Sequence, residues 1–286
     1  MRLFAISDLH MEHPANRQPL RDLPARPDDW LVIAGDVGRG LEHLALCFDI
    51  LVPRFARVVW TPGNHDLWSR PDRPDESRGV ARYEELVALA RAYGVITPED
   101  PFPIFDHPGG PILIAPVFVL YDYSFRPGSV PLAGVVGWAA EANSACADEY
   151  LLHPDPFPSR NAWCKARCAQ TEARLAARPQ ALPTVLISHF SLEEALAVLP
   201  RAPRFTPWCG TWLTRDWHRR FDARAVVFGH LHMPGTRWID GVPFQEVSLG
   251  YPRQRRNGSA IGDHLREVRL EPNERTPAIV GEPGET

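Results

Sequence analysis

The chain has 286 residues, of which 44% are hydrophobic and 23% charged, a balance that indicates a folded rather than a disordered protein. Its formal net charge of −4 excludes a general attraction to nucleic acid or to acidic membranes. No run of about 18 apolar residues is present, so no membrane-spanning helix is expected. The five cysteines, and a start without the pattern of a secretory signal, predict a cytoplasmic protein with reduced thiols.

Short apolar runs that end in turn residues predict buried strands at residues 3–7, 30–34, 58–61, 111–119, 184–188 and 225–228. Apolar positions at three- and four-residue spacing predict helices at 41–51 and 81–93, and a further helix is expected around 162–178. Residues 238–243 have the pattern of a hairpin whose turn is Asp240-Gly241. The strand–helix–strand order predicts an α/β fold.

The segment 121–183 differs from the rest of the chain because it is rich in proline and aromatic residues. We expect it to be an insertion, or cap, on a single domain that covers residues 1–270. Residues 271–286 consist largely of Pro, Glu, Gly and Thr and are expected to form a disordered tail.

Five of the predicted strands are followed at once by residues that can bind metal ions. These are Asp8 and His10, then Asp36, then Asn64, then His189, and finally His230 and His232. Each motif alone has an ordinary interpretation as a turn or a helix cap. Together they are oxygen and imidazole ligands that suit Mn²⁺, Fe or Zn²⁺, and strand ends at one edge of an open sheet are where such sites form. The set contains no cysteine, which argues against a structural zinc site. Cys164 and Cys168 lie one helical turn apart, and we favour core packing for them over a metal pair.

These five blocks, in this order, resemble the calcineurin-like metallophosphoesterases. The resemblance implies a four-layer α-β-β-α sandwich and a dinuclear centre of divalent or mixed-valence ions, Mn or Fe first and Zn as an alternative. It implies that one metal is held by Asp8, His10, Asp36 and His232, and the other by Asp36, Asn64, His189 and His230. Asp36 would bridge the two ions, and a hydroxide between them would attack phosphorus.

The resemblance also implies roles for residues beside the metal ligands. His65 would contact the phosphate and help the leaving oxygen depart. Asp66 would orient His65, with a plain turn or cap residue as the alternative. Arg39 would reach the phosphate or remain an ordinary surface arginine.

Longer stretches resemble a narrower group, the phosphopantetheinyl hydrolases, which remove 4′-phosphopantetheine from holo acyl carrier proteins. They include residues 120–125, 208–211 and 247–253, whereas 126–149 do not fit. A cleft for the thin pantetheine arm would be lined by aromatic side chains, namely Tyr121, Tyr123, Phe125, Trp163 and Trp208. Three arginines, Arg126, Arg204 and Arg253, would meet the phosphate or an acidic carrier surface.

Two other functions remain open at this point. The same metals could serve a phosphatase or phosphodiesterase of a small molecule or nucleotide. A non-catalytic binding scaffold is disfavoured, because every ligand position and His65 are intact. A nuclease is also disfavoured, since no basic stripe with interleaved aromatic residues is present. The sequence predicts no oligomeric state.

Overall fold

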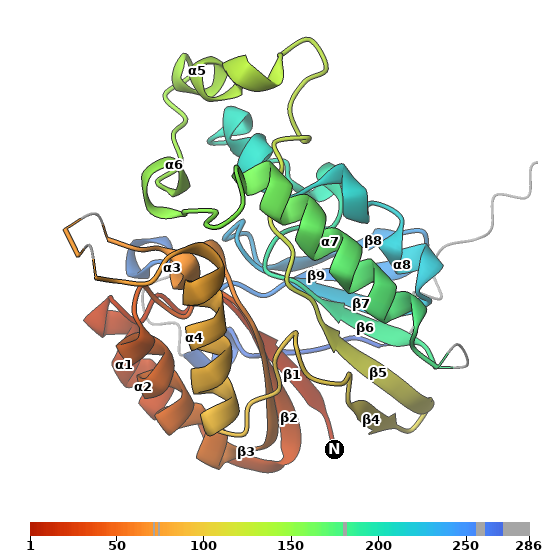
Figure 1. The fold of residues 1–286 in the computed structure, drawn as a ribbon. Coiled ribbons are helices and arrows are strands. Elements are labelled where there is room, and N and C mark those ends of the chain that lie inside the picture. Colours follow the sequence, from red (N-terminus) through yellow and green to blue (C-terminus); the bar gives the residue numbers. More distant parts are fainter. Residues whose placement is uncertain (71, 74, 180–181, 256–260, 271–286) are drawn as a thin grey trace, which may run out of the picture.

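Two β-sheets, one of four strands and one of six, form the centre of the molecule (Figure 1). The structure is a computed structural model that describes residues 1–286 except 71, 74, 180–181, 256–260 and 271–286. The tail expected at 271–286 therefore lies outside the described residues. Both sheets have parallel centres. The six-stranded sheet has an antiparallel strand at each edge and the four-stranded sheet has one at a single edge, which is the pattern of an α/β fold.

The four-stranded sheet has the order β10 (Arg266–Glu267), β1 (Leu3–Ile6), β2 (Arg26–Ala34) and β3 (Phe55–Thr61). The six-stranded sheet has the order β4 (Ile104–His107), β5 (Gly110–Pro116), β6 (Thr184–Ile187), β7 (Ala223–Phe228), β9 (Val242–Glu246) and β8 (Gly235–Ile239). All six predicted strands are present. The strand predicted at 111–119 ends at Pro116, and the buried residues after it continue through the core without forming a ladder.

The two sheets pack face to face through a dry apolar layer. Alternate residues of β1, such as Leu3 and Ala5, lie in this layer with Val185 and Val227 of the larger sheet. Phe4, between them, points to the helical side. Since side chains alternate along a strand, strands covered on both faces are apolar at every position, which explains their continuous apolar runs.

Helices cover the outer face of each sheet (Figure 1). α1 (Pro14–Arg21), α2 (Leu41–Leu51) and α4 (Gly79–Ala92) lie over the smaller sheet, and α7 (Arg160–Ala176) and α8 (Trp217–Arg220) lie over the larger one. The three predicted helices correspond to α2, α4 and α7. The predicted four-layer α-β-β-α sandwich is thereby confirmed.

The chain between β5 and α7 leaves the sandwich. It forms α5 (Val135–Ala140) and α6 (Asp148–Leu151) beyond the ends of the strands, whereas α7 lies against the larger sheet (Figure 1). We call residues 121–159 the α5–α6 segment. Short 3₁₀ helices occupy other connections: Val52–Arg54, Leu132–Gly134, Glu194–Leu196, Pro203–Trp208, Trp212–Thr214, Pro252–Gln254 and Ile261–Asp263.

Several smaller predictions can be compared with the structure. The predicted hairpin is β8–β9, and its turn residues Asp240 and Gly241 have φ of 50° and 74°, as a tight hairpin turn requires. All five cysteines are free and buried, and Cys164 and Cys168 pack in the core as preferred. Among the described residues, no helix is long and apolar enough to cross a bilayer. The cytoplasmic location stays a prediction.

Candidate metal centre

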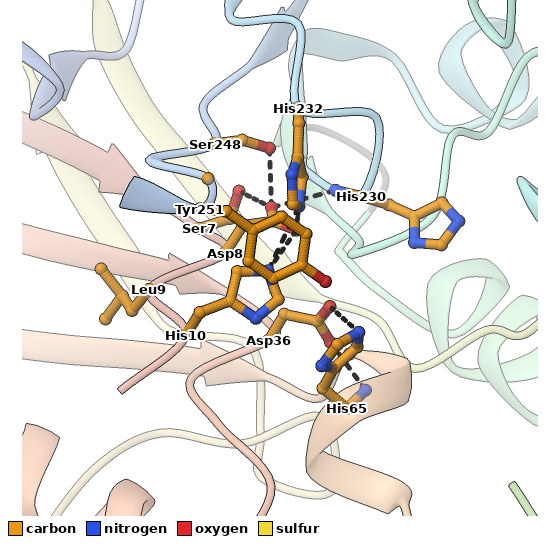
Figure 2. A network of polar contacts seen from close by, with 12 residues as sticks. Ser7, Asp8, Leu9, His10, Asp36, His65, His230, His232, Ser248 and Tyr251 are labelled. Atoms are coloured by element: carbon orange, nitrogen blue, oxygen red, sulfur yellow. Dashed lines mark hydrogen bonds and ion pairs between the residues drawn. The ribbon is translucent and has the colours of Figure 1, made fainter. Parts of the chain in front are cut away.

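The seven predicted metal ligands gather where parallel strands from both sheets end. Asp8 and His10 follow β1, Asp36 follows β2, and Asn64 begins α3 (Asn64–Leu67) directly after β3; His189 follows β6, and His230 and His232 follow β7. The two sheets thus each supply part of one site (Figure 2). This agrees with the rule that sites of α/β proteins form at the carboxyl ends of parallel strands.

Ligand atoms converge most closely around Asp8. His232 Nε2 lies 2.9 Å from Asp8 Oδ1 and 3.2 Å from His10 Nε2. The ligand atoms of these three residues all lie within 4.8 Å of one another. Two imidazole nitrogens and a carboxylate oxygen aimed at one point form an arrangement that one metal ion can satisfy.

Asp36 connects this group to a second one. Its Oδ1 lies 3.5 Å from His189 Nε2, which in turn lies 3.1 Å from Asn64 Oδ1. Within the described residues, Asp36 belongs to two further sets of converging ligand atoms, one with Asp8 and His189 and one with His10 and His65. A carboxylate shared in this way has the position of a bridging ligand.

His230 behaves differently from the other histidines. Its ring centre lies 5.1 Å from that of His189, but the ring points away from Asp8, His10 and His232 in Figure 2. Its Nε2 is buried and has no hydrogen-bond partner within the described residues. An orphaned buried nitrogen beside His189 is compatible with a ligand, and the assignment of His230 to a metal stays a prediction.

Hydrogen bonds fix the orientation of several ligands. His189 Nδ1 lies 2.9 Å from the carbonyl oxygen of Ala34, and His232 Nδ1 lies 2.8 Å from Gln254 Oε1. Because these oxygens accept, each Nδ1 carries the proton and donates it, and each Nε2 presents its lone pair to the site.

The backbone holds the ligands in uncommon conformations. Five of them adopt the left-handed region, with φ of 53° at Asp8, 44° at His10, 52° at Asp36, 70° at His230 and 53° at His232. Such conformations cost about 1–3 kcal/mol each and cluster at functional sites. The neighbouring glycines allow close approach, because a Cβ on Gly63 would collide with the Asp36 carboxylate and one on Gly229 with Asp8.

The electrostatics of the site call for a cation. Asp8 and Asp36 are 0% and 2% exposed. Burial, and then the carboxylates of Asp8 and Asp66, raise the pKa of Asp36 well above its ordinary value. Burial also lowers the pKa of His189 and favours its neutral, metal-binding form. Within the described residues, the ion-pair partners of Asp8 and Asp36 are all histidines, and buried carboxylates beside imidazoles fit a divalent metal.

The geometry can now be compared with known proteins. Residues 1–234 match the calcineurin-like phosphoesterase family. The chain belongs to this family. Calcineurin-like phosphoesterases hydrolyse phosphoester bonds with the help of metal ions, so the protein is a metal-dependent phosphoester hydrolase.

A sequence match and a structural match, both to PptH of one organism, narrow the position of the chain within the calcineurin-like phosphoesterases. It is 47% identical over 272 residues to the [acyl-carrier-protein] phosphodiesterase PptH of Mycobacterium tuberculosis, covering 94% of this chain and 84% of that protein. The crystal structure of phosphopantetheinyl hydrolase (PptH) from Mycobacterium tuberculosis matches with a TM-score of 0.89 at 46% identity, covering 95% of this chain and 96% of that one. The resemblance to the phosphopantetheinyl hydrolases is thereby confirmed.

His65 lies beside Asp36 in the calcineurin-like centre. Its Nε2 is 3.8 Å from Asp36 Oδ2, and its ring stacks on Trp68 with the centres 3.6 Å apart. Burial lowers the pKa of His65 to about 3, so the imidazole is neutral at pH 7. A neutral imidazole still has one N–H group to donate to a phosphate or leaving-group oxygen.

The Asp66 carboxylate contacts backbone N–H groups, as expected of the cap residue that was the alternative to orienting His65. Its carboxylate accepts hydrogen bonds from the backbone N–H groups of Asp36, Val37 and Gly38, at 2.9 to 3.3 Å, and from that of Gly63, at 2.8 Å. These contacts join the loop after β2 to the loop after β3. Asp66 therefore shapes the ligand loops through their backbone, and its described hydrogen bonds do not include the His65 ring.

The side chains predicted to contact substrate differ in how free they are to do so. Arg39 is half exposed at the rim, with its guanidinium 5.0 Å from the Trp68 ring. Arg126 donates to the carbonyl oxygens of Val130 and Tyr123, so its N–H groups organise their own loop. Tyr123 adopts the left-handed region with φ of 61°.

The predicted aromatic cleft is mostly protein core. Its other members, Tyr121, Phe125, Trp163 and Trp208, are at most 1% exposed. Tyr123 lines a cavity of about 430 Å³ beside Arg160 and apolar residues of α5, and Trp163 borders a separate cavity of about 480 Å³ beside Tyr83. Trp208 does not contact solvent, and its indole N–H donates to Glu149 at 2.8 Å. The prediction that Trp208 binds substrate does not agree with this burial.

Two residues beside the centre were missed. Glu12 Oε1 lies 3.4 Å from His10 Nδ1 and 3.8 Å from His65 Nδ1, which places it behind two site histidines. Tyr251 stacks on His10 with ring centres 4.3 Å apart (Figure 2). The spacing Asp8-x-His10-x-Glu12 was a usable signal for Glu12, because a carboxylate often supports a metal-binding histidine.

Proposed function

We propose that this protein is a phosphodiesterase that removes 4′-phosphopantetheine from the serine of a holo acyl carrier protein. The observation that carries the proposal is the 47% identity, over 94% of this chain, to a protein named as an acyl-carrier-protein phosphodiesterase. Water is added at phosphorus, the bond to the serine oxygen breaks, and the products are 4′-phosphopantetheine and the apo carrier.

The site would hold two metal ions, for which Mn and Fe are the best candidates and Zn an alternative. Asp8, His10, Asp36 and His232 would bind one ion, and Asp36, Asn64, His189 and His230 the other. When bound, such a pair activates water and neutralises phosphate charge. The convergence of Asp8, His10 and His232, and the sharing of Asp36, support this division.

The chain's own residues would do the remaining work. His65, held by its stack on Trp68, would donate its N–H to the departing serine oxygen. Arg39 lies over the same Trp68 ring at the open rim and would contact a non-bridging phosphate oxygen or the carrier.

Intact-mass measurement of a holo acyl carrier protein tests the proposal. After incubation with this protein and Mn²⁺, we expect a shift to the apo mass, and no shift with His65→Ala. An unchanged carrier, together with hydrolysis of an aryl phosphodiester, would refute the carrier substrate and leave the metal chemistry in place.

A further inference from the structure

Helix α6 of the α5–α6 segment touches the metal centre through one side chain. Asp148, its first residue, is 0% exposed. Its Oδ1 accepts one hydrogen bond from Asn64 Nδ2 at 2.9 Å and a second from Trp68 Nε1 at 2.7 Å. Both donors belong to the loop and turn after β3, so one carboxylate oxygen holds two neighbours of the site.

The contact with Asn64 decides which end of its amide faces the ligands. Because the NH₂ group donates to Asp148, the amide oxygen is left to point at His189 Nε2, 3.1 Å away. Only the oxygen can bind a metal ion, since an amide nitrogen has no available lone pair. Without the Asp148 acceptor, this hydrogen bond would no longer keep the NH₂ group of Asn64 away from the site, and the amide could turn over.

The contact with Trp68 acts on a different part of the site. The Trp68 ring is the surface on which His65 stacks, with an interplanar angle of 26°. An indole N–H that donates to a buried carboxylate fixes the plane of the ring. Asp148 thus supports both Asn64 and the platform below His65.

We propose that Asp148 is a positioning residue that fixes the amide of Asn64 for the second metal ion and the Trp68 ring beneath His65. The proposal rests on the proposed ligand role of Asn64. It assigns to the α5–α6 segment a direct part in forming the centre.

The segment around Asp148 is firmly held. Arg160 donates to the carbonyl oxygen of Asp148 at 3.0 Å and to that of Leu152 at 3.1 Å. The backbone N–H of Ser69 donates to the carbonyl oxygen of Leu151 at 3.0 Å. These bonds tie α6 both to α7 and to the chain after α3, so the Asp148 carboxylate is held in one place relative to Asn64.

Metal titration of the metal-free protein tests the proposal without any carrier protein. In Asp148→Ala, we expect one of the two Mn²⁺ ions to lose about 10- to 100-fold in affinity, the range seen when groups that orient ligands are removed. Asp148→Asn keeps an oxygen that can accept both hydrogen bonds, so its affinity should stay within a few-fold of wild type. Wild-type affinity in Asp148→Ala, or equal losses in both variants, would overturn the proposal.

A control separates this effect from general loss of stability. Asp29 is also a buried carboxylate, 6% exposed, and it accepts hydrogen bonds from Arg2 at the strand ends far from the ligands. Asp29→Ala should lower the melting temperature and leave both Mn²⁺ affinities unchanged. A loss of Mn²⁺ affinity in this control as large as that in Asp148→Ala would assign the effect to stability and overturn the proposal.

A double-mutant cycle tests whether Asp148 acts through Asn64. In the Asn64→Ala background, adding Asp148→Ala should weaken the second metal no further, because the group it positions is already gone. An additional loss equal to that in the wild-type background would show independent action and overturn the proposal. If Asp148→Ala does not fold, Asp148→Ser takes its place in the cycle. The same variants are also assayed with an aryl phosphodiester, which needs the metal centre but no carrier protein. This assay separates an error in the role of Asp148 from an error in the proposed carrier substrate.

Discussion

The strand-end site and the cluster around Glu149 in the α5–α6 segment differ in what their buried polar atoms contact. At the strand ends, His10 and His232 turn their Nε2 atoms toward each other, 3.2 Å apart. In the α5–α6 segment, Glu149 accepts hydrogen bonds from Tyr123 at 2.7 Å and Trp208 at 2.8 Å and pairs with Arg160. The first set is completed only by an added cation, whereas the second is complete in the protein alone.

This difference separates binding groups from supporting groups. Buried polar atoms are normally paired within the protein, so a cluster that is not paired indicates a ligand. A cluster that is fully paired indicates structural support, even when it is rich in tyrosine, tryptophan and arginine. Three substitutions test the distinction.

Asp36→Asn should have the largest effect, because it removes a charge from a carboxylate that both ligand groups share. Removal of a residue that only orients a ligand lowers metal affinity by up to about 100-fold. We expect Asp36→Asn to lower the affinity for both metals by more than this, and hydrolysis to be lost as a result. Metal content after dialysis measures this. Loss of one metal with the other retained would contradict the bridging position.

His65→Ala should have the next largest effect and should leave the metals in place. Removing a group that assists proton transfer typically lowers kcat by about 10²- to 10⁴-fold. Steady-state kinetics on an aryl phosphodiester, with metal content as the control, measure it. An unchanged kcat would remove His65 from the mechanism.

Trp208→Phe should have the smallest effect on catalysis, because Trp208 belongs to the paired cluster. It removes one hydrogen bond to a charged group, which is worth about 2 kcal/mol of stability. We expect a lower urea midpoint and an unchanged kcat. A large fall in kcat without loss of stability would instead support the original prediction that Trp208 binds substrate.

The sequence was sufficient to predict that the seven candidate ligands gather at one place, because each one follows the end of a strand. Such a ligand is placed by local pattern: a buried strand, a turn and a polar side chain at the sheet edge. The glycines at 35, 63 and 229 precede ligands for the same local reason. The face-to-face packing of two sheets came from the family resemblance, since apolar runs alone do not assign strands to sheets.

The residues that hold the candidate ligands in place could not be predicted in the same way. Asp148 lies 84 positions from Asn64, and no local pattern connects them. The aromatic residues of 121–208 were expected to line a cleft because composition does not distinguish a pocket wall from a core. Asp66 was assigned to His65 as its chain neighbour, whereas its carboxylate reaches back to the backbone of the previous loop.

The distribution of ligands over two sheets has a consequence for when the metals can be acquired. Asp8 and His232 contact each other across 224 positions of the chain. Contacts of such long range form late in folding, because the loop between them must close first. A complete set of candidate ligands therefore requires both sheets to be in place, because Asp8 follows a strand of one sheet and His232 a strand of the other. We therefore expect metal affinity to be lost when the two sheets separate, even if each sheet keeps its own strands.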